Sequence, residues 1–291
     1  MKESFQGTFP IEEIESAIDV DAVILGVPFE DGSKIYPTGT SLAPNVIREV
    51  SNYFSGQSFS KQCIHNKNVL DYGDIDIFGD YKRVMEVIGK KVSNILKKKT
   101  IPILIGGDHS IAYGTAQGIL QSNRKLDGIV WIDAHLDLMD KYPEEKSHTR
   151  ATVLRRIYEL GLFENKNHYF IGSRGHNLGI EEIEFVEKNK MKILEVSKIT
   201  EYSIIDSFIQ EINGKNLYVS LDIDVLDPAF APGVSVPEPG GLSTRELFYI
   251  LELLASKTKC FEIVEVNPKL DQNNITSMVA CKSIFKLLDF M

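Results

Sequence analysis

The chain has 291 residues, of which 43% are hydrophobic and 25% charged, an ordinary composition for a soluble globular protein. Its formal net charge of -9 disfavours a general nucleic-acid or membrane-surface binder, so we expect neither nucleic acid nor membrane as a partner. Residues 1–5 lack the core of a signal peptide, and no run approaches about 18 apolar residues, which predicts a cytoplasmic protein.

Short apolar runs and helix-like patterns alternate along the whole chain. The runs that we predict to be strands are 22–28, 68–71, 101–105, 128–132, 168–172, 191–194, 216–221 and 260–265. Apolar residues recur at helical spacing in two further segments, Val84, Ile88, Val92 and Ile95, and Met278, Cys281, Phe285 and Leu288. This alternation predicts a mostly parallel sheet covered by helices, either closed as a TIM barrel or open as a three-layer sandwich. No Pro-, Gly- and Ser-rich linker divides the chain, so we expect a single domain over residues 1–291.

Polar motifs follow three of the predicted strands. They are Gly106-Gly-Asp-His109-Ser110 after 101–105, Asp133-Ala-His135-Leu-Asp137 after 128–132, and Asp222-Ile-Asp224 after 216–221. Residues two apart in an extended chain point to the same side, and the carboxyl ends of parallel strands meet at one edge of a sheet. Each motif alone has an ordinary alternative as a hydrogen-bonded loop. Together they predict that the four aspartates and two histidines lie close to one another.

Four carboxylates and two imidazoles are costly to hold close together unless a cation neutralises them. Oxygen-rich donors suit manganese or magnesium, and histidine shifts the balance toward manganese or iron. The cysteines, Cys63, Cys260 and Cys281, are too far apart in the sequence for a zinc cluster or a disulfide framework. Six ligands exceed what one ion with an open position needs. The pattern therefore predicts two ions, with a hydroxide formed between them near neutral pH.

Longer motifs around these residues make the sequence resemble the ureohydrolases, the family of arginases and agmatinases. The matching segments are GGDHS at 106–110, DAHLD at 133–137, SLDIDVLDP at 220–228, PGVSVPEPGGLS at 232–243 and IVEVNP at 263–268, with VILGVPFEDGS at 23–33 and YGDIDI at 72–77 upstream. They extend over nearly the whole chain, from about residue 22 to 271. The resemblance implies a three-layer α/β/α sandwich with a mostly parallel eight-stranded sheet, not a TIM barrel.

The resemblance also gives roles to the six predicted ligands. One manganese ion would be held by His109, Asp133, Asp137 and Asp222, and the other by Asp133, His135, Asp222 and Asp224. Asp133 and Asp222 would bridge the two Mn2+ ions. The hydroxide between the ions would attack a guanidinium carbon, and urea and a protonated amine would leave. Asp137 would also accept a hydrogen bond from the hydroxide and steer its proton.

Two further residues match catalytic positions of the family. Glu265, in IVEVNP, would hold the planar guanidinium in attack geometry, where the alternative is an ordinary strand-end glutamate. His148 would be the proton shuttle, because family members have a histidine in the loop after DAHxD. The sequence departs from the family here, since Thr149 and Arg150 are extra residues between His148 and the next helix. This shift would either move His148 by several ångströms or put Arg150 in its place.

The expected substrate rests on the loops around these motifs. The loop 138–147 resembles the agmatinase branch and lacks the Asn- and Ser/Thr-rich stretch with which arginases bind an α-amino-acid carboxylate. Arg174-Gly-His176-Asn177 stands where arginases have an acidic pair after the arginine, and we expect no ligand role for His176. The resemblance therefore implies agmatine as the substrate, putrescine and urea as products, and a homotrimer or homohexamer. Guanidinobutyrate or arginine as the substrate, and a catalytically silent polyamine-binding relative, are the alternatives.

Overall fold

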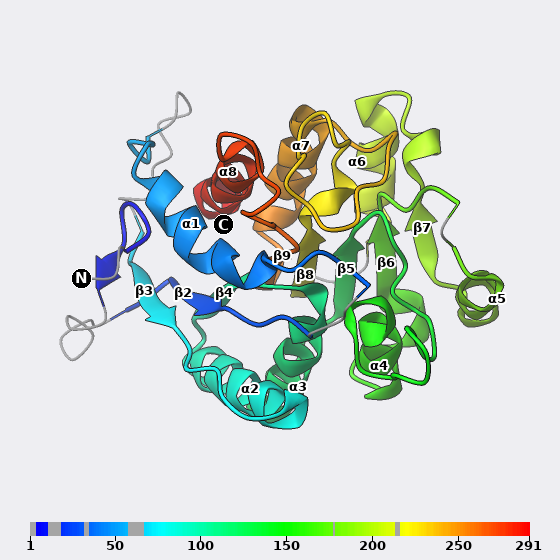
Figure 1. Cartoon of the computed structure of the whole chain (residues 1–291), viewed down its shortest axis with the longest axis horizontal. Coiled ribbons are helices and arrows are strands. Elements are labelled where there is room, and N and C mark those ends of the chain that lie inside the picture. Colours follow the sequence, from blue (N-terminus) through cyan, green and yellow to red (C-terminus); the bar gives the residue numbers. More distant parts are fainter. Residues whose placement is uncertain (1–3, 11–18, 32–34, 58–66, 177, 213–215) are drawn as a thin grey trace.

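The computed structural model describes the chain except residues 1–3, 11–18, 32–34, 58–66, 177 and 213–215, so Cys63 and Asn177 lie outside the described residues (Figure 1). One sheet forms the centre of the described part, and all its strand pairs are parallel. In chain order the strands are β1 (Phe9–Pro10), β2 (Ala22–Val27), β3 (Val69–Asp74), β4 (Ile101–Gly106), β5 (Gly128–Ile132), β6 (His168–Ile171), β7 (Lys192–Leu194), β8 (Leu217–Asp222) and β9 (Thr258–Val264). Their order across the sheet is β1-β3-β2-β4-β9-β8-β5-β6-β7.

The eight predicted strands are confirmed, and the two-residue strand β1 adds a short edge next to β3. Helices cover both faces of the sheet, which confirms the open sandwich and excludes the barrel (Figure 1). One layer contains α1 (Ala43–Ser51), α6 (Tyr202–Gln210), α7 (Thr244–Ala255) and α8 (Ile275–Phe290). The other contains α2 (Tyr81–Lys97), α3 (Ala112–Ser122), α4 (Val153–Glu159) and α5 (Ile180–Asn189). Among the described residues, no helix is both long and apolar enough to cross a bilayer.

Strand β5 illustrates why the sequences of the central strands are continuous apolar runs. Its five residues are all buried, because helices cover the sheet on both sides. Val130 and Ile132 pack into the layer of α6, α7 and α8, whereas Ile129 and Trp131 pack into the layer of α2, α3 and α4. Alternate residues of one strand thus contribute to two separate cores, as the period of two in an extended chain requires.

The two helices expected from their apolar spacing are also present. Val84, Ile88 and Val92 are buried on one side of α2. This helix begins after Asp80, whose side chain accepts a hydrogen bond from the backbone N–H of Arg83 at 2.9 Å and so satisfies a free donor of the first turn. On α8, the Cys281 side chain is buried in the core as a free thiol.

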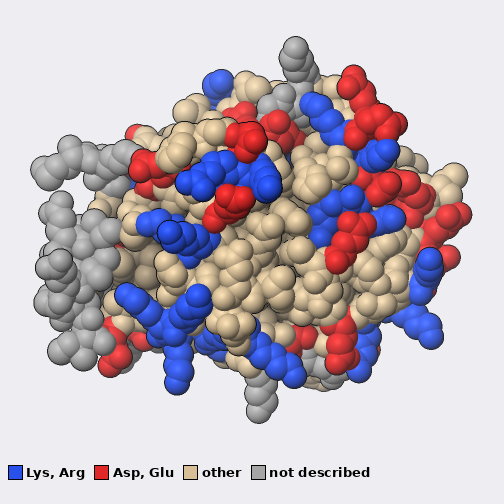
Figure 2. Space-filling model, turned by 90° about the horizontal axis from the view of Figure 1, so that it is seen from below, with Lys and Arg blue, Asp and Glu red and all other residues tan. Residues whose placement is uncertain are grey.

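The face seen in Figure 2 carries lysine, arginine, aspartate and glutamate side chains interspersed around an uncharged centre. Charges of both signs therefore alternate over this face instead of forming one continuous basic area.

Candidate metal centre and active-site pocket

The three predicted ligand motifs meet at the carboxyl edge of the sheet, because the strands that precede them lie together in the middle of the sheet, with only β9 between β4 and β8. His109 follows β4, the DAHLD motif follows β5, and Asp222 and Asp224 lie at the end of β8. In the sheet these strands stand in the order β4-β9-β8-β5. Glu265 directly follows β9 and therefore enters the same group.

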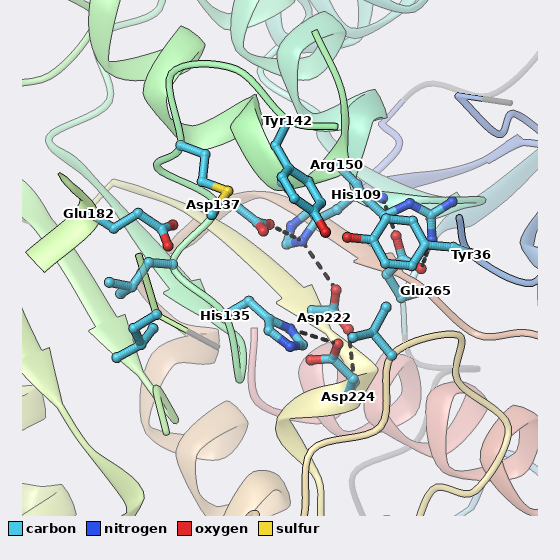
Figure 3. A pocket seen from close by; sticks show the side chains of 15 residues that line it. Tyr36, His109, His135, Asp137, Tyr142, Arg150, Glu182, Asp222, Asp224 and Glu265 are labelled. Carbon is cyan, nitrogen blue, oxygen red and sulfur yellow. Dashed lines mark hydrogen bonds and ion pairs between the residues drawn. The ribbon is translucent and has the colours of Figure 1, made fainter. Parts of the chain in front are cut away.

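One group of donors surrounds His109. Its Nδ1 lies 3.1 Å from Asp133 Oδ2, 3.3 Å from Asp137 Oδ2 and 3.2 Å from Asp222 Oδ2. Figure 3 shows Asp137 and Asp222 approaching the imidazole from two directions. All four residues are buried, so three strand ends direct four donor atoms toward one point away from bulk water.

A second group shares Asp133 with the first. His135 Nδ1 lies 3.1 Å from Asp224 Oδ2 and 3.5 Å from Asp133 Oδ1. The two oxygens of Asp133 thus face different histidines. Two adjoining groups of possible metal ligands result, one with His109, Asp133 and Asp137, and one with Asp133, His135 and Asp224.

The chemistry of these donors fits divalent cations. Among the described residues, His109 Nδ1 and Asp133 Oδ2 are buried and have no hydrogen-bond partner. Burial raises the pKa of Asp137 to about 7, with the Asp133 carboxylate adding to the shift, and burial followed by the Asp224 and Asp133 carboxylates raises the pKa of Asp222 well above its usual range. Negative charge is therefore under-compensated at this point, and a cation would satisfy both the charge and the unpartnered atoms.

The other side of the His109 ring is held by a hydrogen-bonded chain. His109 Nε2 lies 2.8 Å from Ser220 Oγ, and that hydroxyl donates to Glu262 Oε1 at 2.7 Å. Because the serine proton is committed to Glu262, Ser220 accepts from the ring, which places the proton on Nε2 and leaves the Nδ1 lone pair toward the carboxylates. Tyr218 and Thr115 also donate to Glu262, which is fully buried in β9. Such a chain fixes the orientation and tautomer of a metal-binding histidine.

Two site residues have an uncommon backbone conformation. Asp137 has φ +54° and Glu265 has φ +64°, both in the left-handed region. This conformation costs a residue with a Cβ roughly 1–2 kcal/mol. The surrounding contacts hold it, since the Glu265 N–H donates to Gly107 O at 2.8 Å and the Asp137 carbonyl accepts from Leu154 N at 3.1 Å. Both carboxylates are thereby turned toward the pocket.

A pocket of about 250 Å³ lies over the two donor groups. It combines the candidate ligands with aromatic and apolar walls, and it is lined by Tyr36, His109, His135, Leu136, Asp137, Met139, Tyr142, Arg150, Ala151, Leu178, Glu182, Asp222, Asp224, Val236 and Glu265. Figure 3 shows Tyr36 and Tyr142 next to Arg150 and His109. The mixture of a few converging polar groups and apolar walls is typical of a small-molecule site.

Arg150 places a cation inside this pocket. Its Nη1 donates to Glu265 Oε2 at 2.6 Å, and its Nη2 donates to Asp108 Oδ2 at 3.1 Å and lies 3.8 Å from Asp31 Oδ1. The guanidinium carbon is 5.1 Å from the centre of the Tyr36 ring. Burial raises the pKa of Glu265 to about 8, although the Arg150 charge acts in the opposite direction.

Comparison with known proteins identifies the scaffold on which this site is built. Residues 20–289 match the arginase family. The chain belongs to the arginase family. It is 31% identical over 291 residues to the agmatinase of Bacillus subtilis, an alignment that covers 98% of this chain and 97% of that protein.

Two other similar proteins extend the comparison. An uncharacterised 32.2 kDa protein of Methanothermus fervidus is 37% identical over 246 residues, which cover 84% of this chain and 82% of that protein. The solved structure of the proclavaminate amidinohydrolase from Streptomyces clavuligerus has a TM-score of 0.89 and 26% identity, and the alignment covers 99% of this chain and 96% of that chain. The sequence-based assignment to the ureohydrolases is thus confirmed.

This arginase-family protein brings seven of the eight predicted site residues to one place, and His148 is the exception. The residues brought together are His109, Asp133, His135, Asp137, Asp222, Asp224 and Glu265, with Arg150 beside them. His148 is not among the residues that line the pocket. Its ring is exposed and packs edge-on against Tyr81 and Tyr113, with centroid distances of 5.5 and 5.6 Å. The shift anticipated in this loop therefore puts Arg150, and not His148, at the pocket.

Several residues of this arginase-family site were not predicted. Tyr36, Tyr142 and Glu182 line the pocket from loops and from α5, and no local pattern points to them. Glu262 did carry a signal, because a glutamate inside a buried strand is rare unless it is paired. Arg174 is a further case, with Nη1 donating to Val225 O and Nη2 to Asp224 O, both at 2.9 Å. These bonds tie the turn that carries Asp224.

Proposed function

We propose that this arginase-family protein is a dimanganese amidinohydrolase and that agmatine is its substrate, with putrescine and urea as products. The observation that supports this most is the convergence of the two donor groups and Glu265 on one pocket. His109, Asp133, Asp137 and Asp222 would hold one ion, and Asp133, His135, Asp222 and Asp224 the other. Bound in this way, two divalent ions supply Lewis acidity and lower the pKa of water toward neutrality.

The protein's own groups would perform the remaining tasks. The Glu265 carboxylate would accept hydrogen bonds from the substrate guanidinium and fix its plane, which supplies orientation. Asp137 has a pKa raised by burial to about 7, so its carboxylate would take a proton from the water that attacks the guanidinium carbon and pass it to the nitrogen that becomes the leaving amine. The carbon–nitrogen bond to the amine then breaks, and the amine leaves in its protonated form beside urea.

The choice of agmatine rests on the walls of the pocket. Met139, Leu178 and Val236 offer apolar surface along which a tetramethylene chain would lie. The Glu182 carboxylate, which accepts hydrogen bonds from Leu138 N and Gly179 N at 2.9 Å, lines the pocket across from Arg150 and would attract a second cationic group on the substrate (Figure 3). The relatives act on different compounds according to their names, agmatine and proclavaminate derivatives, so the scaffold alone does not select the substrate.

Urea release from agmatine by the manganese-loaded protein tests the proposal. We expect kcat/KM for agmatine to exceed the values for arginine and guanidinobutyrate by about tenfold or more. The Arg150 guanidinium in the pocket is already paired with Glu265 and Asp108, whereas the Glu182 carboxylate in the wall would attract the agmatine ammonium and repel a substrate carboxylate. The same assay with metal-stripped protein should give no urea. If none of the three compounds is hydrolysed although two manganese ions are measured per chain, the proposed enzymatic activity is contradicted, and a catalytically silent binding protein is favoured.

The proton-shuttle role that the resemblance implies for His148 is untested, and the position of the ring outside the pocket favours the opposite expectation. Since the ring contacts Tyr81 and Tyr113 outside the pocket, we expect His148→Ala to change kcat by less than about twofold. A steady-state comparison of wild type and variant between pH 6 and 9 measures this. A fall of about a hundredfold in kcat, restored by added imidazole, would give His148 the shuttle role after a movement of its loop.

A further inference from the structure

Arg150 carries a guanidinium, the same group as the proposed substrate. It forms an ion pair with Glu265, the carboxylate that would bind the substrate guanidinium. Both oxygens of Glu265 already accept a hydrogen bond, Oε1 from the His109 N–H at 2.8 Å and Oε2 from Arg150 Nη1 at 2.6 Å. The arginine is 7% exposed, so this contact is made inside the pocket and not at its surface.

The arginine is held by more than one partner. Its second nitrogen, Nη2, donates to Asp108 at 3.1 Å and lies 3.8 Å from Asp31, and its backbone N–H points to Asp31 Oδ2 at 3.4 Å. The turn that carries it begins with a reciprocal pair of hydrogen bonds between Thr149 and Thr152. Contacts with Asp108 and Asp31 therefore hold the Arg150 guanidinium in place independently of Glu265.

We propose that Arg150 is an internal competitor for the guanidinium subsite and determines how tightly the pocket binds cationic substrates. The inference rests on the proposed function, in which Glu265 receives the substrate guanidinium. An incoming guanidinium would take Glu265 Oε2 from Nη1, while Nη2 keeps Arg150 on Asp108 and Asp31. The exchange needs only a small displacement, because one of the two terminal nitrogens retains its carboxylates.

The electrostatics give the direction of the effect. Two guanidinium ions that share one carboxylate repel each other, and the repulsion is weakly screened at a buried site. The wild-type protein should therefore bind guanidinium compounds more weakly than a variant in which position 150 is uncharged. The repulsion weakens binding of the ground state and of the transition state by similar amounts. It should therefore raise KM more than it changes kcat.

Calorimetric titration of agmatine into metal-stripped protein, in which no agmatine is consumed, tests this proposal without depending on turnover. We expect Arg150→Gln to bind agmatine about tenfold or more tightly than wild type. Arg150→Lys keeps the charge and should stay near wild type. Arg156→Gln is the matched control, since Arg156 pairs with Asp140 and Glu159 on the next helix, α4, and does not line the pocket.

Putrescine, which has the same chain but no guanidinium, separates competition at Glu265 from a general change in pocket charge. Competition predicts that Arg150→Gln tightens agmatine binding much more than putrescine binding. Equal tightening of both ligands, or unchanged or weaker agmatine binding, would overturn the proposal. If agmatine binds more tightly to the variant but no guanidino compound is hydrolysed, the competition holds and the proposed activity fails.

A measurement on the wild type covers the case in which Arg150→Gln does not fold. The Arg150 Nε–H is buried, and among the described residues Nε has no hydrogen-bond partner, which makes its nuclear magnetic resonance signal distinct from those of exposed arginines. The signal is identified by its loss in Arg150→Lys. Saturation with agmatine should shift it, and an unchanged Arg150 signal at saturation would contradict the exchange.

Discussion

We expect the replacement of Asp133 by Ala to remove metal from both proposed positions and to lower kcat by about a thousandfold or more for any guanidino compound that the wild type hydrolyses. Asp133 is the residue shared by the two donor groups, with Oδ2 at 3.1 Å from His109 Nδ1 and Oδ1 at 3.5 Å from His135 Nδ1. Its loss opens both groups at once. Manganese per chain, measured by mass spectrometry after loading and desalting, checks the first part, and urea release checks the second.

Two other variants complete this experiment. Asp140→Ala is the control, because Asp140 lies in the same loop but its side chain is 49% exposed and pairs with Arg156 Nη2 at 2.7 Å. This variant should keep both ions and full activity. Asp224→Ala should keep at most one ion, since Asp224 belongs to the second group alone. Two ions bound to Asp133→Ala with wild-type affinity would refute the shared position.

Exchanging Glu265 for Gln should lower kcat/KM by about a hundredfold while leaving the manganese content unchanged. Glutamine keeps the volume of the side chain and removes the negative charge that would face the substrate guanidinium. Hydrogen bonds to a charged group contribute about 1.5–3 kcal/mol, which corresponds to roughly ten- to a hundredfold in rate. Steady-state kinetics together with metal analysis separates this residue from the metal ligands, whose loss affects both measurements.

Glu246→Gln is the matched control for this substitution. Glu246 accepts from Ser243 N at 2.7 Å at the start of α7 and does not line the pocket. We expect unchanged kinetics and a decrease in the free energy of unfolding of about 1 kcal/mol or less. A Glu265→Gln enzyme with kcat/KM within about threefold of wild type would show that another group orients the substrate.

The fold was largely predictable because its determinants are local or periodic. Each buried strand is a short apolar run, and α2 and α8 repeat apolar residues at helical spacing. Periodicity did not distinguish an open sheet from a barrel, since both bury strands on two faces. The family motifs made that distinction, and the sheet order confirms it. Strand β1 was missed because two residues, Phe9 and Pro10, carry no periodic pattern.

The candidate site was predictable where its residues follow strands and unpredictable where they lie in loops. Three strand ends, with spacing of two within each motif, determine where the aspartates and histidines point. The loop after Asp137 has no such constraint, and a displacement of two residues decides whether His148 or Arg150 reaches the pocket. The start of the helical turn at Thr149 places Arg150 there. Contacts across the fold, such as Tyr36 over Arg150, have no signature in the local sequence.

The order of strands in the sheet has a consequence for how this chain is synthesised. Strands β8 and β9 come last along the chain, yet they lie in the middle of the sheet between β4 and β5. Until the ribosome has released residues 217–264, β4 and β5 are both edge strands with unpaired backbone groups and apolar side chains. A nascent or truncated chain that stops before β8 is therefore exposed to aggregation at two edges. The same two strands that join the halves of the sheet also carry Asp222 and position Glu265, so a chain that has closed its sheet has also completed its pocket.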